Sequence, residues 1–484
     1  MKIAAAVLGA ISMNMASAQA PAEKFLWGAA SAAYQIEGAT TQEGRGPSVW
    51  DVYLDEQNLA GPGITGKVAI NFYDRKQYLQ DIALFRKMGL TSYRFSISWT
   101  RIIPDGLGPV NPAAVAHYRQ FIADLKAAGI KPLVTLYHWD MPASLAAAGG
   151  WENRASIDWF QRYASVIFAN FADQVDSFVL VNEPSVEHAM QNMAHDRAAG
   201  QPGQLDIVPG RARLEGTLKA FNHILLASAA AKTQFVAANY RGRLGLAVPL
   251  FPTLTGPGAT AADVKAARLA DGVLNRWFLD AMYKGTYPAD LLQVAADEKL
   301  DIDVRPGDAA TIGAAKFDFL GINYYAPLYV RQASGGNPAY DPRTYLPTDQ
   351  KLAFNGAVRP DQFNALLGRI RDEYGNPPVI ITENGAGFPG EDVLKDGAVN
   401  DIGRCQYIVD HVAAMQSAMK AGANVQAYHV WSSHDNLEWL FGYASRFGMI
   451  YVDYDTQKRV PKRSAKVYAD IIRNGSAPAG ACAG

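Results

Sequence analysis

The feature that most restricts the fold of this chain is a repeated alternation of short apolar runs and longer helical patterns. Apolar runs bounded by turn-forming residues are typical of buried strands in a parallel sheet. They cover residues 25–30, 92–96, 132–137, 177–181, 244–249, 319–323, 379–382 and 425–430. Helical patterns lie between them, at residues 74–88, 112–128, 157–171, 214–233 and 402–421. Eight strands separated by helices predict an α/β fold of the (β/α)8 barrel (TIM barrel) type.

The barrel is expected to form a single domain. No linker, charge run or low-complexity tract divides the 484 residues, and α/β barrels of this length occur as one domain. Polar stretches rich in Gly and Pro at residues 61–66 and 333–350 are interpreted as loops inserted on a face of the barrel. We therefore predict one barrel domain over residues 21–475 and a C-terminal tail over residues 476–484.

The N-terminus has the pattern of an export signal. A basic start at Lys2 is followed by a mostly apolar run over residues 3–15 and by Ala18-Gln19-Ala20, a small-residue cleavage pattern. The sequence predicts a signal peptide over residues 1–20, a periplasmic or extracellular mature protein and no membrane insertion of that mature form. The alternative is an ordinary N-terminal extension or helix.

Two cysteines, Cys405 and Cys482, leave two interpretations open. In an exported protein they can pair and fix the C-terminal tail. Otherwise they are two unrelated thiols, because sequence alone does not test the geometry that a disulfide requires.

Composition excludes some partners and favours others. The chain has 45 basic and 46 acidic residues, so it offers no field for nucleic acid or for an anionic membrane. It also has 23 Tyr, 20 Phe and 9 Trp residues. Aromatic side chains can belong to the core, but a small-molecule carbohydrate site uses them as apolar platforms with polar edges.

Two of the predicted strands run directly into a glutamate. Residues 177–183 end at Glu183 and residues 379–383 end at Glu383. A carboxylate at the end of a buried strand is expensive to bury unless it has a task. Two of them on two strands indicate one acid and one nucleophile facing each other, which is the arrangement of retaining glycoside hydrolysis.

Polar and aromatic side chains follow seven of the eight predicted strands. A single Arg or His at such a position is more often structural, but the repetition is difficult to explain by structure alone. Barrel enzymes keep their sites at the carboxyl ends of the strands, so these side chains are expected to meet there. Besides the two glutamates, the residues are Gln35, Arg94, His138, Asn182, Asn323, Tyr325 and Trp431.

With these motifs in place, the chain resembles glycoside hydrolase family 1, the β-glucosidase family. The resemblance extends from residue 25 to residue 465. Its most specific parts are Asn182-Glu183-Pro184, Thr382-Glu383-Asn384-Gly385 and the stretch from Trp431 to Trp439. It implies a retaining exo-β-glycosidase that releases terminal, unphosphorylated β-D-glucosyl residues by double displacement, without metal or cofactor.

The resemblance also implies a role for each site residue. Glu183 is expected to be the general acid/base and Glu383 the nucleophile, kept charged and oriented by Arg94 and Tyr325. Asn323 is expected near Glu183, Asn182 on the sugar 2-hydroxyl and Trp431 under the sugar ring. A carboxylate at position 438 would repel a phosphorylated sugar. The remaining sugar hydroxyls are assigned to Gln35, His138, Glu438 and Trp439.

Several alternatives stay open. The same catalytic pair serves β-galactosidases, β-fucosidases, β-xylosidases and transglycosylases, and a non-catalytic sugar-binding relative is a third class. Val181 and His434 depart from the family pattern, as does a loop over residues 187–203. In that loop His188 and His195 are interpreted as polar residues lining a cleft rather than as metal ligands. The sequence gives neither the leaving-group preference nor the oligomeric state.

Overall fold

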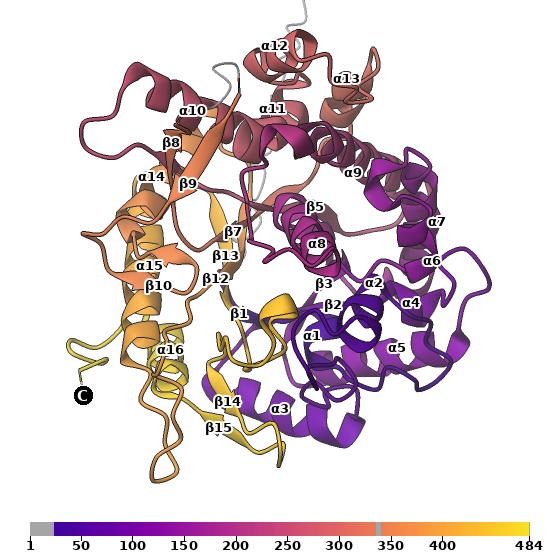
Figure 1. Cartoon of the computed structure of the whole chain (residues 1–484). Helices are drawn as coiled ribbons and strands as arrows, with labels where there is room; N and C mark the ends of the chain where they lie inside the picture. The colour runs from indigo at the N-terminus through magenta and orange to yellow at the C-terminus, as the bar shows by residue number, and fades with distance from the viewer. Residues whose placement is uncertain (1–23, 335–339, 484) are drawn as a thin grey trace, which may run out of the picture.

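A computed structural model of the chain describes residues 24–334 and 340–483, and the predicted signal peptide lies outside these residues. Within them, eight parallel strands close into a barrel in the order β1-β13-β12-β7-β5-β4-β3-β2. Figure 1 shows these strands at the centre of the molecule, surrounded by helices. The predicted (β/α)8 barrel is therefore confirmed.

The barrel strands follow the predicted ranges closely. They are β1 (Leu26–Ala30), β2 (Ser92–Ser96), β3 (Lys131–Tyr137), β4 (Ser177–Asn182), β5 (Arg243–Pro249), β7 (Phe319–Tyr324), β12 (Val379–Asn384) and β13 (Val425–Trp431). The helices predicted from periodicity are α3 (Arg75–Met88), α5 (Pro112–Ala127), α7 (Ser156–Phe171), α9 (Arg211–Ala237) and α15 (Ile402–Lys420).

Local sequence explains where these helices begin and which face they bury. Asn111 accepts a hydrogen bond from the backbone N–H of Ala113 at the start of α5, and Pro112 occupies its first turn. In α7, Phe160, Ile167 and Phe171 recur at helical spacing and are fully buried. Amphipathic helices of this kind cover the outside of the barrel and bury the apolar core between helix and strand.

Further helices complete the outer layer and the carboxyl end of the barrel. They are α1 (Ala33–Ile36), α2 (Val49–Asp51), α4 (Trp99–Ile102), α6 (Ala143–Ala147), α8 (Pro184–Ala198), α10 (Ala261–Asp271), α11 (Trp277–Lys284), α12 (Ala289–Asp297), α13 (Asp308–Ala314), α14 (Pro360–Glu373) and α16 (Arg463–Asn474). Short π and 3-10 turns are η1 (Val52–Glu56), η2 (Gly150–Glu152), η3 (Gly272–Arg276) and η4 (Trp439–Phe441).

Short strands outside the barrel form three small sheets. One contains β6 (Thr253–Leu254), β8 (Leu328–Gln332) and β9 (Pro342–Tyr345). The other two pair β10 (Leu352–Ala353) with β11 (Gly356–Ala357), and β14 (Ile450–Val452) with β15 (Arg459–Pro461). The β8–β9 hairpin lies beside α10, outside the ring of barrel strands (Figure 1).

Two stretches that were predicted as loops contain regular structure. Residues 187–203 were predicted to be a loop because they are polar, but most of them belong to α8, which starts at Pro184 and ends before Gly200. Buried Met190 and Met193 supply its apolar face. Likewise, β9 lies within the predicted 333–350 loop because it pairs antiparallel with β8.

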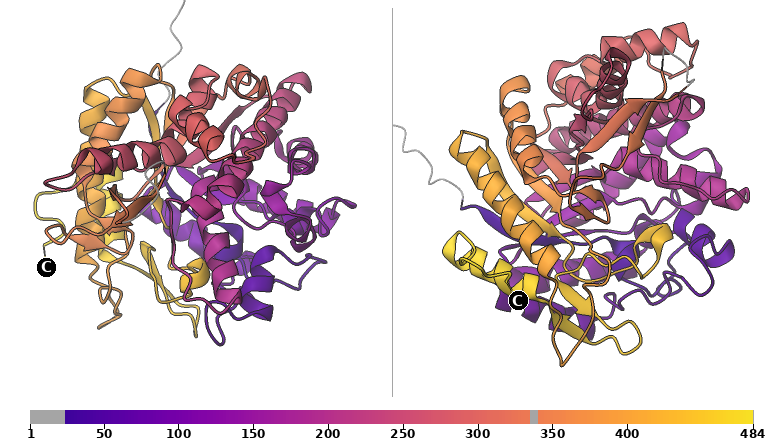
Figure 2. Two further views of the ribbon diagram at one scale, coloured as in Figure 1. Left: turned by 45° about the horizontal axis from the view of Figure 1, so that its top comes forward. Right: turned by 60° about the vertical axis from the view of Figure 1, so that its left-hand side comes forward.

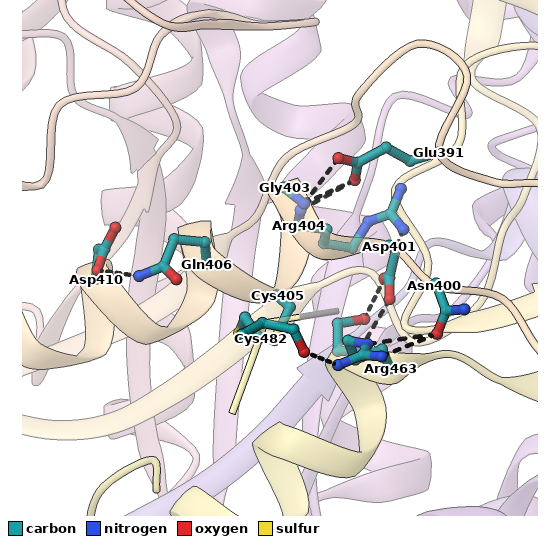
Figure 3. Close-up of a disulfide and its surroundings, with 12 residues drawn as sticks. Glu391, Asn400, Asp401, Gly403, Arg404, Cys405, Gln406, Asp410, Arg463 and Cys482 are labelled. Atoms are coloured by element: carbon teal, nitrogen blue, oxygen red, sulfur yellow. Dashed lines mark hydrogen bonds and ion pairs between the residues drawn. A yellow bond between two sulfur atoms is a disulfide. The ribbon is translucent and has the colours of Figure 1, made fainter. Parts of the chain in front are cut away.

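The structure joins the C-terminal tail to the barrel. Cys405 near the start of α15 forms a disulfide with Cys482, with 5.7 Å between the Cα atoms (Figure 3). Helices α15 and α16 pack against each other on one flank of the barrel (Figure 2). The open question about the two cysteines is thus answered in favour of pairing. None of the described helices has the length and apolarity needed to cross a membrane.

Candidate active site

Both strand-end glutamates lie where the pairing register between neighbouring barrel strands is irregular. The register of β4 against β5 shifts between Val179 and Asn182, immediately before Glu183. The register of β12 against β7 shifts between Ile381 and Glu383. Such irregularities redirect a side chain out of the regular pleat and are common beside active sites. At both places the carboxyl side chain is turned into the mouth of the barrel, where it lines the same cavity.

Glu183 also has an unusual backbone conformation. Its φ is 46° and its ψ is 61°, a left-handed conformation that side chains other than glycine seldom adopt. A hydrogen bond of 2.9 Å from its backbone N–H to the carbonyl of Ala247 holds it there. Trp139 and Trp439, which line the same cavity, have positive φ values of 74° and 47°. Strained residues of this kind gather where a fold imposes a functional geometry.

A short hydrogen-bond network connects the two glutamates. Arg94 donates to Glu383 Oε1 at 2.5 Å and to Asn182 Oδ1 at 2.7 Å. Asn323 donates to the same Asn182 oxygen at 3.0 Å and to Glu183 Oε1 at 2.8 Å. The Tyr325 hydroxyl donates to Glu383 Oε2 at 2.6 Å. Each glutamate is therefore held in place, but only Glu383 is paired with a cation.

This asymmetry separates the protonation states of the two carboxyls. Burial, followed by the charge of Glu383, raises the pKa of Glu183 well above its ordinary value. Burial also raises the pKa of Glu383, and Arg94 and Tyr325 oppose that rise. The sequence predicted a lowered pKa at Glu383, but the pKa is raised, because the effect of burial outweighs the effects of Arg94 and Tyr325. Glu183 remains the carboxyl that holds a proton more tightly.

Several side chains that were predicted to bind sugar have free hydrogen-bonding atoms. Among the described residues, Gln35 Oε1 and His138 Nδ1 are buried and have no hydrogen-bond partner. Gln35 Nε2 donates to Glu438 Oε2 at 3.4 Å, and Asn182 Nδ2 lies 3.1 Å from His138 Nε2. Buried polar atoms in native proteins nearly always have partners. These two atoms are therefore placed to receive a polar ligand.

The charge states of His138 and Glu438 follow from their burial. Burial and the nearby Arg94 lower the pKa of His138 well below its ordinary value, so the imidazole is neutral. Burial and Glu383 raise the pKa of Glu438 to about 8. This rise favours the protonated form of Glu438 near neutral pH, whereas the sequence predicted a carboxylate. Donation from ligand hydroxyls to Glu438 would favour its ionised form.

Aromatic rings enclose the cavity. The imidazole of His138 stacks on Trp431, with 5.7 Å between ring centroids, and Trp139 packs against Trp439 at 4.7 Å. Gln35, Arg94, Asn182 and Asn323 do not line the cavity but support the side chains that do. The lining residues are His138, Trp139, Glu183, Val186, Met190, Leu205, Tyr325, Phe354, Asn355, Glu383, Trp431, Glu438, Trp439, Phe441 and Phe447.

Some of these residues were missed from the sequence. Trp139 directly follows His138 at the end of a predicted strand, so its position was a usable signal. Its indole N–H donates to the carbonyl of Asn182 at 2.9 Å. Leu205 and Phe354 come from long connections and have no strand-end signal. Within residues 24–334 and 340–483, no group of three or more His, Cys, Asp or Glu side chains is placed to hold a metal ion.

Comparison with known proteins identifies the family of this chain. The sequence profile of glycosyl hydrolase family 1 matches residues 17–476. The chain belongs to glycosyl hydrolase family 1. Beta-glucosidase A of Enterobacter agglomerans is 64% identical over 466 residues, which cover 96% of this chain and 97% of the relative. Beta-glucosidase A of Thermotoga maritima is 36% identical over 462 residues, 93% of this chain and 97% of the relative.

Solved structures of family 1 members superpose along nearly the whole chain. The Thermotoga maritima family 1 β-glucosidase in complex with isofagomine lactam gives a TM-score of 0.83 at 34% identity, covering 94% of this chain and 98% of that one. The family 1 β-glucosidase of Exiguobacterium antarcticum B7 gives a TM-score of 0.82 at 36% identity, with coverages of 94% and 99%. This chain is thus a glycoside hydrolase with a single barrel domain.

Proposed function

We propose that this family 1 enzyme is a β-glucosidase, which hydrolyses terminal β-D-glucosyl residues with retention of configuration. The observation that carries the proposal is the asymmetric pair of buried glutamates. Glu383 contacts Arg94 and Tyr325, whereas Glu183 contacts a neutral amide and faces a second acid. Retaining hydrolysis needs one ionised and one protonated carboxyl, and this difference in contacts supplies both.

In the first step, Glu383 attacks the anomeric carbon and Glu183 donates its proton to the glycosidic oxygen, which leaves as an alcohol. The Tyr325 hydroxyl and the Arg94 guanidinium fix the two oxygens of the nucleophile, so that it attacks in one orientation. The product of this step is a glycosyl group joined to Glu383 by an ester bond.

In the second step, a water molecule attacks the anomeric carbon while Glu183 removes a proton from the water, the bond from that carbon to Glu383 breaks, and Glu383 leaves as a carboxylate. The change of role at Glu183 has a local electrostatic cause. The charge of Glu383 is one reason that the pKa of Glu183 is raised, and that charge is absent while Glu383 is esterified. The pKa of Glu183 therefore falls in the intermediate, and the residue can act as a base.

The free polar atoms around the cavity support a neutral, hydroxyl-rich sugar. His138 offers a buried ring nitrogen and Glu438 a carboxyl group in the cavity wall, and Gln35, which donates to Glu438, has a buried carbonyl oxygen without a partner among the described residues. No Lys or Arg lines the described cavity, and the buried Arg94 behind it is already engaged by Glu383 and Asn182. An unphosphorylated glucoside, such as cellobiose, another oligosaccharide or an aryl glucoside, fits this chemistry better than a 6-phosphoglucoside.

We further propose export to the periplasm or the cell exterior, with a mature chain that starts near Pro21. The support is the signal-peptide pattern of residues 1–20 together with the Cys405–Cys482 disulfide, since disulfides persist in oxidising compartments. N-terminal sequencing of protein from the native host checks this, and recovery of Met1 would contradict it.

The deciding experiment for the catalytic roles uses azide as an external nucleophile. Glu183→Ala should still react with aryl glucosides whose leaving groups need no acid, and azide should then give a β-glucosyl azide. Glu383→Ala should lose roughly 10⁴-fold or more in kcat, and azide should give the α-anomer. The same anomer from both variants would show that the roles are misassigned.

A panel of chromogenic glycosides tests the sugar. The wild-type enzyme should have its highest kcat/KM on a β-glucoside among the β-gluco, β-galacto, β-fuco, β-xylo and 6-phospho-β-gluco substrates. A higher value on any of the others would replace glucoside specificity with that activity and leave the catalytic pair unaffected.

A further inference from the structure

A second cavity lies beside the catalytic one and has no part in the mechanism described above. Its volume is about 420 Å³, within the range of small-molecule sites. Val49, Met141 and Trp151 contribute apolar wall, and η2 and α6 contribute backbone on one side. Polar side chains come from α8, which contributes His188, Gln191 and His195, and from Tyr53, Glu152 and Asn153.

Helix α8 separates the two cavities. Val186 and Met190, four residues apart, line the catalytic cavity, whereas His188, Gln191 and His195 line the second one. Residues spaced by three, four or seven share one face of a helix, so each set forms its own stripe. The two cavities are thus distinct spaces on different faces of one helix.

One polar side chain of the second cavity, His188, is free to bind a ligand. His188 is 9% exposed, and neither of its ring nitrogens has a hydrogen-bond partner in the part of the chain that the structure describes. Burial, followed by the neighbouring His195 and Arg213, lowers the pKa of His188 to about 4. At neutral pH the imidazole is therefore uncharged and offers one donor and one acceptor.

The neighbours of His188 in the cavity add further uncharged hydrogen-bond donors and acceptors. His195 Nε2 lies 3.3 Å from the Tyr53 hydroxyl, and Gln191 donates to the buried Glu187 at 3.0 Å. The cavity is therefore lined by two imidazoles, an amide and a phenol together with apolar side chains, and by one carboxylate, Glu152. Uncharged donors and acceptors beside an apolar surface suit a neutral polyhydroxylated ring, because its CH faces and its hydroxyls are both satisfied.

We propose that this cavity, lined by His188, Gln191, His195 and Tyr53, is a second saccharide-binding site, separate from the catalytic cavity. Its ligand class is a neutral monosaccharide or short oligosaccharide, of the kind that the enzyme releases. The site binds sugar without cleaving it, because the catalytic glutamates line the other cavity.

Two methionines allow each cavity to be observed separately. Met141 lines the second cavity and Met190 the catalytic one. Glucose is titrated into full-length protein with ¹³C-labelled methionine methyl groups, assigned by single Met→Leu variants. The same titration is repeated after 2-deoxy-2-fluoroglucosyl fluoride has transferred its sugar to Glu383 with loss of fluoride. The expected result is a saturable shift of the Met141 signal in both samples and a silent Met190 signal in the labelled one.

Variants connect the Met141 signal to the cavity wall. His188→Phe keeps the ring but removes both nitrogens, and it should weaken glucose binding at Met141 by about tenfold, the loss of one to two hydrogen bonds. His117→Phe makes the same change at a histidine stacked on Tyr73, away from both cavities, and should change nothing. Gln191→Leu repeats the test if His188→Phe does not fold.

The outcomes separate this site from the proposed function. Two results would overturn the second site. One is a Met141 signal in labelled enzyme that does not shift or shifts without saturation. The other is glucose binding that His188→Phe and Gln191→Leu leave unchanged. Failure of the fluoride reagent to attach, seen by intact mass, contradicts the role of Glu383 instead. The Met141 titration of unlabelled protein then decides the second site by itself.

Discussion

Two of the regions in which the protein buries carboxyl groups treat these groups in opposite ways. One region is the catalytic cavity, where Glu183 and Glu438 have no cation of their own. The other is an ion cluster at the starts of α15 and α16 and in the connections beside them, in which each carboxylate is paired with a cation at 2.8 Å or less. The members of this α15–α16 ion cluster are Asp392, Asp401, Arg404, Asp435, Arg446 and Lys462.

The direction of each pKa shift depends on whether the buried carboxyl group is paired with a cation. Burial tends to raise the pKa of Asp392, but the hydrogen bonds and charge of Arg404 hold it below its ordinary value. Burial raises the pKa of Glu438 to about 8, and Glu383 adds to that rise. Burial alone therefore does not identify a functional acid. A buried acid that faces another acid instead of a cation is the one that can exchange a proton near neutral pH.

The largest expected effect is a loss of activity without a loss of stability when an acid of the catalytic cavity is replaced. Glu183→Gln removes the proton donor while its amide can still accept from Asn323, so kcat/KM on unactivated β-glucosides should fall about 10³-fold. Its free energy of unfolding at neutral pH should stay the same or rise, because an unpaired buried acid is lost. Steady-state kinetics and urea denaturation measure the two quantities. A variant that is both inactive and strongly destabilised would contradict the comparison.

The next largest effect is expected in the α15–α16 ion cluster, where a substitution should lower stability and leave the catalytic rate nearly unchanged. Asp392→Asn leaves Arg404 and Lys462 each with one fewer anionic partner inside the α15–α16 ion cluster. Breaking a buried pair should lower the free energy of unfolding by about 3 kcal/mol. The folded variant should retain a kcat within about twofold, since the cluster touches no reacting atom. A loss below 1 kcal/mol would show that the remaining pairs compensate.

A smaller effect concerns sugar recognition. If Glu438 accepts from the sugar as proposed, Glu438→Ala should lower kcat/KM for a β-glucoside by about 30-fold, one charge-assisted hydrogen bond. A β-xyloside, which lacks the hydroxymethyl group, should lose less. The measurement compares two enzymes on two substrates. Equal losses on both sugars would show that Glu438 does not contact the hydroxymethyl group.

The smallest effect is a pH dependence of stability at a buried acid that has no catalytic role. Burial raises the pKa of Glu187 to about 8. Between its unfolded value and about pH 8 the folded state holds a proton that the unfolded state lacks. The stabilising contribution of Glu187 is therefore present in acid and is lost as the pH rises through about 8. Glu187→Gln should be more stable than wild type at pH 9, and the difference should shrink as the pH falls toward 5, by urea titration.

A wild-type protein that is as stable as Glu187→Gln at pH 9 would show that Glu187 titrates normally. The comparison between paired and unpaired acids would then apply to the catalytic cavity alone.

Much of the fold followed from the sequence because its signals are local. All eight barrel strands were predicted within two residues at each end, and the start of α5 at Pro112 was predicted to the residue. Local patterns failed where pairing or packing over a distance decides the conformation. Helix α8 has a polar exposed face, so its residues 187–198 resembled a loop. Strand β9 exists because β8 lies beside it.

The sequence likewise predicted some parts of the site and missed others. The strand-end rule and the family resemblance located Glu183, Glu383 and Arg94, because a parallel barrel brings strand ends together at one rim. The sequence did not show that one amide, Asn182, accepts from both Arg94 and Asn323, nor that Trp139 supports it. Residues such as Phe354, on long connections, reach the cavity from positions that no periodicity marks.

By itself, the sequence determined the barrel, the rim where the chemistry lies and the two carboxyl groups, because these depend on hydrophobic period and on residue type. Only the tertiary structure decided which acid lies beside a cation, how burial shifts each pKa, and that Cys405 meets Cys482. The physical reason is that electrostatic energies depend on distance and desolvation, which arise when segments far apart in the chain come together.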